Sequence, residues 1–156
     1  MEKAHGFYDF RKDLAVATDT ESEVASLLEK IYNVKIIERR HDNQYDLKAR
    51  NAYGSFFTFE VKEDFTHART GNVGVEFSCR GKDSGIRVSK ADYYIYKLHF
   101  NDGKTETYIM RTETLKKMVE DKLYFRIVNG GDKGSDSMNY LFKSDVFRAH
   151  GKKISD

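Results

Sequence analysis

Hydrophobic residues recur every three or four positions in one segment near the N-terminus, a spacing typical of a helix with one buried face. The positions concerned are Val24, Leu27, Leu28 and Ile31. We therefore predict a helix over residues 21–32, with Asn33 as its stop signal.

The start of this helix carries a capping signal. Glu21 and Glu23 each stand three residues after a threonine, Thr18 and Thr20, as a capping box requires. The sequence predicts that one of the two threonines caps the helix.

Most of the remaining apolar runs predict strands. These runs cover residues 34–38, 45–50, 55–62, 73–79, 91–100, 105–110 and 139–142. Two further short helices are expected over 115–120, capped by Thr112, and near 145–150, while 80–85 and the glycine-rich 129–137 are expected to be loops. No repeat or linker divides the chain, so we expect a single domain over residues 1–156. The element order predicts a central mixed β-sheet flanked by helices, an α/β or α+β fold.

Residues 45–50 and 55–62 predict a β-hairpin. Their apolar side chains share one face only if directly paired residues have numbers with an even sum. A three-residue loop over 52–54, with Gly54 in the left-handed conformation, gives such a register. Asn51 is then opposite Ser55.

This register also brings two carboxylates together, because Asp46 falls opposite Glu60 and cross-strand Cβ atoms are about 4.5–5.5 Å apart. Lys62 lies on the same face. Adjacent carboxylates repel each other unless a cation neutralises them, and Mg²⁺ binds to one or two carboxylates together with waters and substrate phosphate. The pattern therefore predicts a metal-dependent phosphodiesterase site in which Lys62 orients water or stabilises developing negative charge. The alternative is a solvated cross-strand ion cluster.

The residues around this hairpin also carry a family resemblance. The helix that begins at Glu21, the strand over 34–37, Tyr45-Asp46-Leu47 and Phe59-Glu60-Val61-Lys62 together resemble the PD-(D/E)XK nuclease superfamily, in particular the archaeal Holliday-junction resolvases. The match covers about residues 18–63, and Tyr45 replaces the nominal proline. The resemblance implies a restriction-endonuclease-like fold in which Asp46 and Glu60 bind metal and Lys62 is catalytic.

Many members of this superfamily take a further carboxylate from the first helix. The matching position is Glu21, with Glu23 as the second choice. The resemblance implies that Glu21 completes the metal site, whereas its alternative role is a favourable charge at the helix N-terminus.

Residues 70–94 are similar to a phage-type subgroup of the same superfamily. Within them, the segment 80–90 carries four basic residues and one acidic residue, a composition suited to phosphate contacts. The expected nucleic-acid contacts are Arg80, Lys82, Ser84 and Lys90, and the alternative is an ordinary solvated turn. Glu76 is expected either to add a metal contact or to be a surface charge.

The amino-acid composition excludes only a few classes of protein and of binding site. The 27 basic and 25 acidic residues give a net charge of +2, too small to indicate nucleic-acid binding without local clustering. The single cysteine, Cys79, excludes an internal disulfide and a multi-cysteine zinc site. No apolar run approaches the roughly 20 residues of a membrane span, and the first residues lack a signal-peptide core. We therefore expect no membrane insertion and a cytoplasmic location, which is the host cytoplasm if the chain is phage-encoded.

These observations together predict a Mg²⁺-dependent endodeoxyribonuclease that also accepts Mn²⁺, acts on branched or structured DNA and uses no small-molecule cofactor. A homodimer is expected, because two cuts need two active sites. The alternatives are a sequence-specific homing or restriction-type endonuclease, a non-catalytic DNA-binding module on the same fold, and a phage accessory protein that binds a host protein.

Overall fold

The fold is described from a computed structural model of the chain, which describes residues 19–40, 44–130 and 136–155. An N-terminal helix covers residues 19–32. The strands are β1 (Lys35–Arg39), β2 (Leu47–Arg50), β3 (Phe56–Asp64), β4 (Asn72–Cys79), β5 (Lys82–Asp83), β6 (Tyr93–His99), β7 (Thr105–Arg111), β8 (Arg126–Asn129), β9 (Ser137–Lys143) and β10 (Lys152–Lys153). The other helices are α2 (His67–Thr70), the 3₁₀-helix η1 (Gly85–Arg87), α3 (Thr112–Glu120) and α4 (Ser144–Ala149).

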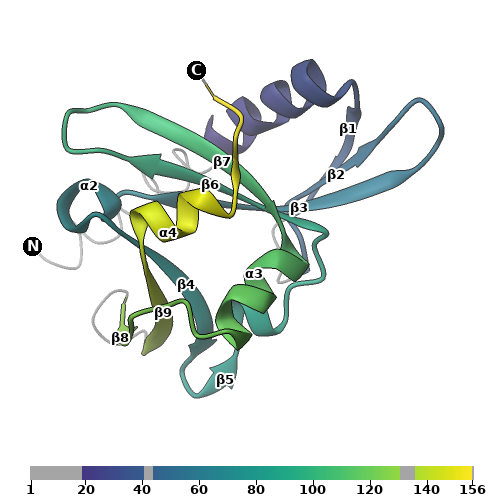
Figure 1. The fold of residues 1–156 in the computed structure, drawn as a ribbon. Helices are drawn as coiled ribbons and strands as arrows, with labels where there is room; N and C mark the ends of the chain where they lie inside the picture. The colour runs from purple at the N-terminus through teal and green to yellow at the C-terminus, as the bar shows by residue number, and fades with distance from the viewer. Residues whose placement is uncertain (1–18, 41–43, 131–135, 156) are drawn as a thin grey trace, which may run out of the picture.

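The strands form two sheets in an α+β arrangement (Figure 1). The first is a six-stranded mixed sheet with the order β1-β2-β3-β6-β7-β10, and the second is a four-stranded sheet with the order β5-β4-β9-β8. Figure 1 shows the N-terminal helix on one side of the first sheet, and α3, α4 and the second sheet on the other. The chain leaves the first sheet after β3, builds α2, β4, β5 and η1, and returns as β6, which pairs parallel to β3.

Alternation along the strands divides the apolar side chains of the first sheet between two cores. On one face Leu47, Phe59 and Ile95 pack against Val24 and Leu28 of the N-terminal helix. The opposite face forms the larger core with the second sheet, α3 and α4, and it includes Tyr94, Tyr96, Leu98, Phe142 and Phe147. Glu60 and Lys62 alternate with Phe59 and Val61, so they lie on the face toward the second sheet.

The β2–β3 hairpin has the predicted register. Ala49 pairs with Phe57 and Leu47 with Phe59, and the Asn51 amide donates to the Ser55 carbonyl at 3.0 Å. Gly54 has φ of 82°, which is the left-handed conformation that the three-residue loop requires. This register continues to place Asp46 opposite Glu60.

The predicted N-terminal helix is confirmed, but its buried face is different. The buried positions include Thr20, Glu21 and Ala25, whereas Ile31 is exposed. Thr20 is inside the helix and its hydroxyl donates to Glu63 Oε1 at 2.5 Å, so the prediction that Thr20 caps the helix is wrong. Thr18 lies outside the described residues. Asn33 ends the helix as predicted, with φ of 53°.

Several predictions about the second half of the chain need correction. A single sheet was expected, but β4 and β9 belong to a separate sheet because β4 pairs antiparallel with β9. The segment 80–85 is not all loop, since it contains β5 paired with β4. Thr112 is the first residue of α3 and its cap is Arg111 in extended conformation. Residues 131–135 of the glycine-rich loop lie outside the described residues.

Within the described parts of the chain, none of the helices combines the length and the apolar character that a membrane span needs.

Candidate active site

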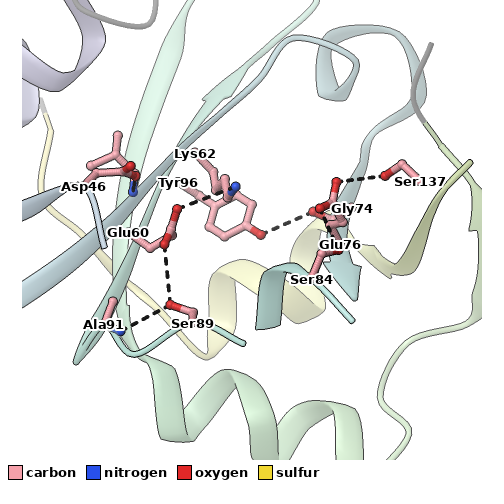
Figure 2. Close-up of polar contacts among 11 residues, drawn as sticks. Asp46, Glu60, Lys62, Gly74, Glu76, Ser84, Ser89, Ala91, Tyr96 and Ser137 are labelled. Atoms are coloured by element: carbon pink, nitrogen blue, oxygen red, sulfur yellow. Dashed lines mark hydrogen bonds and ion pairs between the residues drawn. The ribbon is translucent and has the colours of Figure 1, made fainter. Parts of the chain in front are cut away.

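Asp46 is held rigidly at the start of β2. Its amide donates to the Phe59 carbonyl at 2.9 Å, and its carbonyl accepts the Arg40 amide at 2.7 Å. Its side-chain Oδ2 accepts the Val61 amide at 2.7 Å. Because both the backbone and the carboxylate are tied to β3, the Asp46 side chain is fixed beside Glu60 (Figure 2).

Glu60 is a buried acid, with only 8% of the residue exposed. Burial is the main cause that raises its pKa, and the adjacent Asp46 raises it further by charge repulsion and by a hydrogen bond to the protonated form. Lys62 opposes this shift, but the pKa still rises to about 7. Glu60 is thus less solvated than a carboxylate of an exposed cross-strand ion cluster would be, whereas Lys62 and Asp46 remain partly exposed.

Lys62 supplies the positive charge of the group. Its Nζ lies 3.7 Å from Glu60 Oε2, and 41% of its side chain is exposed. The ammonium therefore contacts the carboxylate and also reaches solvent. The structure brings Asp46, Glu60 and Lys62 together on one face, as the hairpin register predicts.

Two residues near Glu60 have no signal in the sequence. Ser89 is buried, and its Oγ lies 3.5 Å from Glu60 Oε1 and accepts the Ala91 amide at 3.2 Å. Tyr94 pairs with Glu60 across the parallel β3–β6 ladder. The Tyr94 hydroxyl is buried and makes no hydrogen bond of regular geometry among the described residues. Burial raises its pKa, an interaction with the Ser89 side chain lowers it, and the nearby charges of Glu60, Asp46 and Glu76 raise it further. These neighbours depend on the pairing of β3 with β6, whose paired residues are 34 positions apart in the sequence.

Glu76 on β4 is half-buried and has a different environment. Ser84 Oγ donates to its Oε2 at 2.9 Å, and Ser137 Oγ donates to its Oε1 at 2.8 Å. Gly85 allows this arrangement, because a Cβ at that position would be 2.1 Å from the Glu76 carbonyl oxygen. Figure 2 shows Glu76 and its two serines separated from Glu60 by Tyr96.

The two glutamates of the N-terminal helix lie on the other side of the sheet. Glu23 forms an ion pair with Lys97 at 2.7 Å, and Glu21, on the same helix, is buried. Within residues 19–40, 44–130 and 136–155, no three acidic, histidine or cysteine side chains are grouped as a metal site would need. The structure therefore groups two carboxylates, and a metal-binding role for Glu21 stays a prediction.

The basic residues predicted to contact nucleic acid are divided between two places. Arg80 and Lys82 lie at the turn between β4 and β5, and Ser84 is engaged by Glu76. Lys90 lies elsewhere, since its amide donates to the Gln44 carbonyl at 3.0 Å, two residues from Asp46. Of this set, the structure places only Lys90 beside the paired carboxylates.

Comparison with protein-family models and with curated proteins finds no match to this chain. The site is therefore interpreted from its own geometry and from the resemblance in the sequence.

Proposed function

We propose that this protein is a divalent-metal-dependent nuclease that hydrolyses phosphodiester bonds in DNA at the site formed by Asp46, Glu60 and Lys62. The observation that carries the proposal is the buried Glu60 carboxylate beside the half-buried carboxylate of Asp46, with a lysine next to them. Burying a charge is unfavourable unless the charge is compensated, and the structure retains Glu60 next to a second acid.

The donor set fits Mg²⁺ or Mn²⁺. Both ions prefer carboxylate oxygens, and Mg²⁺ keeps several waters while it binds to one or two carboxylates and to substrate phosphate. Asp46 and Glu60 would hold the ion. When bound, the ion polarises a phosphoryl oxygen and lowers the pKa of water. A neighbouring cation would also favour ionised Glu60, because it cancels the repulsion from Asp46.

The protein's own side chains then have separate tasks. Asp46 keeps its position through the Val61 amide, so the site is preorganised and needs little rearrangement. Lys62 reaches solvent from its contact with Glu60, and from there its ammonium stabilises negative charge on a phosphate or orients the attacking water. The Ser89 hydroxyl contacts the Glu60 carboxylate and helps to hold it in position.

The arrangement of the first sheet supports the finer proposal of a restriction-endonuclease-like core. The antiparallel order β1-β2-β3 is followed by β6, which is parallel to β3, and the N-terminal helix covers one face. With the resemblance in residues 18–63, this favours a structure-selective enzyme of the Holliday-junction-resolvase type. A homodimer is proposed with it, since paired cuts need two sites.

The first prediction concerns Lys62 and Asp46. Lys62→Ala and Asp46→Asn should each lower the rate of DNA cleavage in Mg²⁺ by about a hundredfold or more, the scale of losing one electrostatic group at a transition state. The measurement is single-turnover cleavage of labelled duplex, single-stranded, flapped and four-way-junction DNA.

Lys97→Ala is the matched control. Lys97 also pairs with a glutamate, but on the opposite face of the sheet, so its loss should leave cleavage within about threefold. Cleavage that survives both Lys62→Ala and Asp46→Asn would show that this site is not the active one, and absence of cleavage by the unchanged protein on the whole panel would refute the proposed nuclease.

A further inference from the structure

A groove of about 450 Å³ begins at Ser89, the residue that contacts Glu60, and runs along the end of the first sheet. One side of the groove is the start of β3 with Phe56, and the other is the N-terminal end of α3 with Arg111 and Lys116. A pocket of this volume can hold a ligand as large as a drug molecule. One or two nucleotides of a single strand have a similar size.

Three cations line this groove without an ion-pair partner. Lys90, Arg111 and Lys116 are exposed, and none of them pairs with a carboxylate among the described residues. Other basic side chains do pair, such as Lys97 with Glu23 and Lys117 with Asp121. Cations gathered in a groove and left unpaired create a positive potential that attracts phosphate.

The groove also contains two acids, Asp92 and Glu113, which offset part of this charge. Asp92 Oδ2 accepts hydrogen bonds from the Thr58 amide at 2.9 Å and from the Thr58 hydroxyl at 3.1 Å, so it serves to join β3 to the start of β6. Glu113 lies in the first turn of α3. Three cations against two carboxylates leave the groove with a positive balance.

The first turn of α3 forms one wall of the groove. Thr112 is 6% exposed and its hydroxyl is buried, so the hydroxyl itself is not presented to the groove. Thr112 is the first residue of a nine-residue helix whose cap makes no side-chain hydrogen bond. A helix N-terminus presents amide donors and a partial positive charge to an anion.

Phe56 provides a surface for a base at the same groove. Phe56 is 54% exposed as a residue, and Lys48 Nζ lies over one face of its ring at 4.8 Å from the ring centre. An exposed ring stacks on a base face that no neighbouring base covers, and single strands offer such faces along their length, which is how they are bound without sequence preference.

We propose that this groove binds an unpaired DNA strand next to the scissile phosphate, with a phosphate between Lys90, Arg111 and Lys116 and a base on Phe56. This inference rests on the proposed function, since it assigns the single-stranded part of the nuclease's substrate. The inference goes beyond what we expected from the sequence. Among Phe56, Lys90, Arg111 and Lys116, the sequence indicated only Lys90 as a DNA contact.

The test is binding of fluorescent DNA in Ca²⁺, followed by anisotropy, with a hairpin duplex that carries a single-stranded extension and the same hairpin with a blunt end. The unchanged protein should bind the extended DNA at least tenfold more tightly than the blunt one. Arg111→Ala/Lys116→Ala should lose this preference and lower the slope of log K against log salt by about 0.7, which is the contribution of one phosphate contact to a single strand. Phe56→Ala should weaken binding of the extended DNA by about fivefold or more, the cost of one lost stacking contact.

Two variants serve as matched controls. Lys117→Ala alters the same exposed helix outside the groove, and Phe125→Ala removes another exposed phenylalanine with a lysine over its ring. Both should bind the extended DNA as the unchanged protein does.

Equal affinity of the unchanged protein for extended and blunt DNA, or full retention of the preference in the groove variants, would overturn the proposal. Cleavage in Mg²⁺ is scored separately. If the groove variants cleave DNA normally and still prefer the extended DNA, the proposed role of the groove is refuted and the proposed nuclease activity is not. If the preference depends on the groove residues but the unchanged protein cleaves no DNA, the proposed nuclease activity is refuted and the binding role of the groove is supported.

Discussion

Glu60 is a buried acidic residue and Glu76 is a half-buried one, and their surroundings differ in kind. Glu76 has a serine hydroxyl on each oxygen, so its charge is compensated by neutral donors. Glu60 has a second carboxylate beside it, a lysine at 3.7 Å and one long contact to Ser89. A satisfied buried carboxylate stabilises a fold, whereas a carboxylate next to another one is stable only with a proton or a cation.

The two tyrosines on β6 show the same contrast. The Tyr96 hydroxyl donates to the Gly74 carbonyl at 3.3 Å, which joins the two sheets near Glu76. The Tyr94 hydroxyl, near Glu60, makes no hydrogen bond of regular geometry among the described residues and interacts only weakly with Ser89. The Tyr96 hydroxyl is therefore better satisfied than that of Tyr94, which lies near the place where we propose that substrate and metal bind.

The largest expected effect on stability concerns pH and Glu60. The folded-state pKa of about 7 lies above the ordinary value of 4.5, so the folded protein holds a proton between these values that the unfolded chain has lost. Stability should fall as pH rises from about 4.5 to 7 and stay low above, by about 3 kcal/mol from this group. Glu60→Gln should remove this loss and raise the free energy of unfolding at pH 8. Urea denaturation with chelator at pH 5 and pH 8 measures it.

Glu76→Gln is the counterpart and should have the opposite sign. The amide keeps one acceptor and loses the charge that accepts two hydroxyl hydrogen bonds, so stability at pH 8 should fall by about 1–2 kcal/mol. If both variants changed stability in the same direction at pH 8, the contrast between the two acids would be wrong.

A smaller effect is expected from the tyrosines. Tyr96→Phe removes a hydrogen-bonded hydroxyl and should destabilise by about 1 kcal/mol, whereas Tyr94→Phe removes a buried hydroxyl without a hydrogen bond of regular geometry and should be neutral or stabilising. Thermal unfolding of the two variants side by side checks this. A loss of stability in Tyr94→Phe equal to that in Tyr96→Phe would show that the Tyr94 hydroxyl is satisfied in solution.

The sequence predicted the hairpin and its paired acids because both depend on local rules. The alternation of Phe57 and Phe59 fixes the buried face, and Gly54 fixes the loop, so the register that joins Asp46 to Glu60 follows without knowledge of the rest of the chain. The same locality made the strand boundaries of β4, β6 and β7 predictable to within two residues.

Features that depend on distant contacts were not predictable. Ser89 reaches Glu60 only through the parallel pairing of β3 and β6, and no local pattern indicates that β4 leaves the first sheet to pair with β9. The buried face of the N-terminal helix was misjudged because Thr20 is buried by its hydrogen bond to Glu63, while apolar spacing alone favoured Ile31.

The most direct test of the central claim, that Asp46 and Glu60 hold a divalent cation, is calorimetric titration of the protein with Mn²⁺ at pH 6 and pH 8. Binding at one site should be about tenfold weaker at pH 6 and release close to one proton there, because the ion must displace the proton from Glu60, whose pKa is about 7. Release should be near zero at pH 8, and Glu60→Gln should abolish the binding while Glu76→Gln preserves it. Binding of Mn²⁺ that is unchanged in Glu60→Gln, or no binding by the unchanged protein at pH 8, would contradict the account.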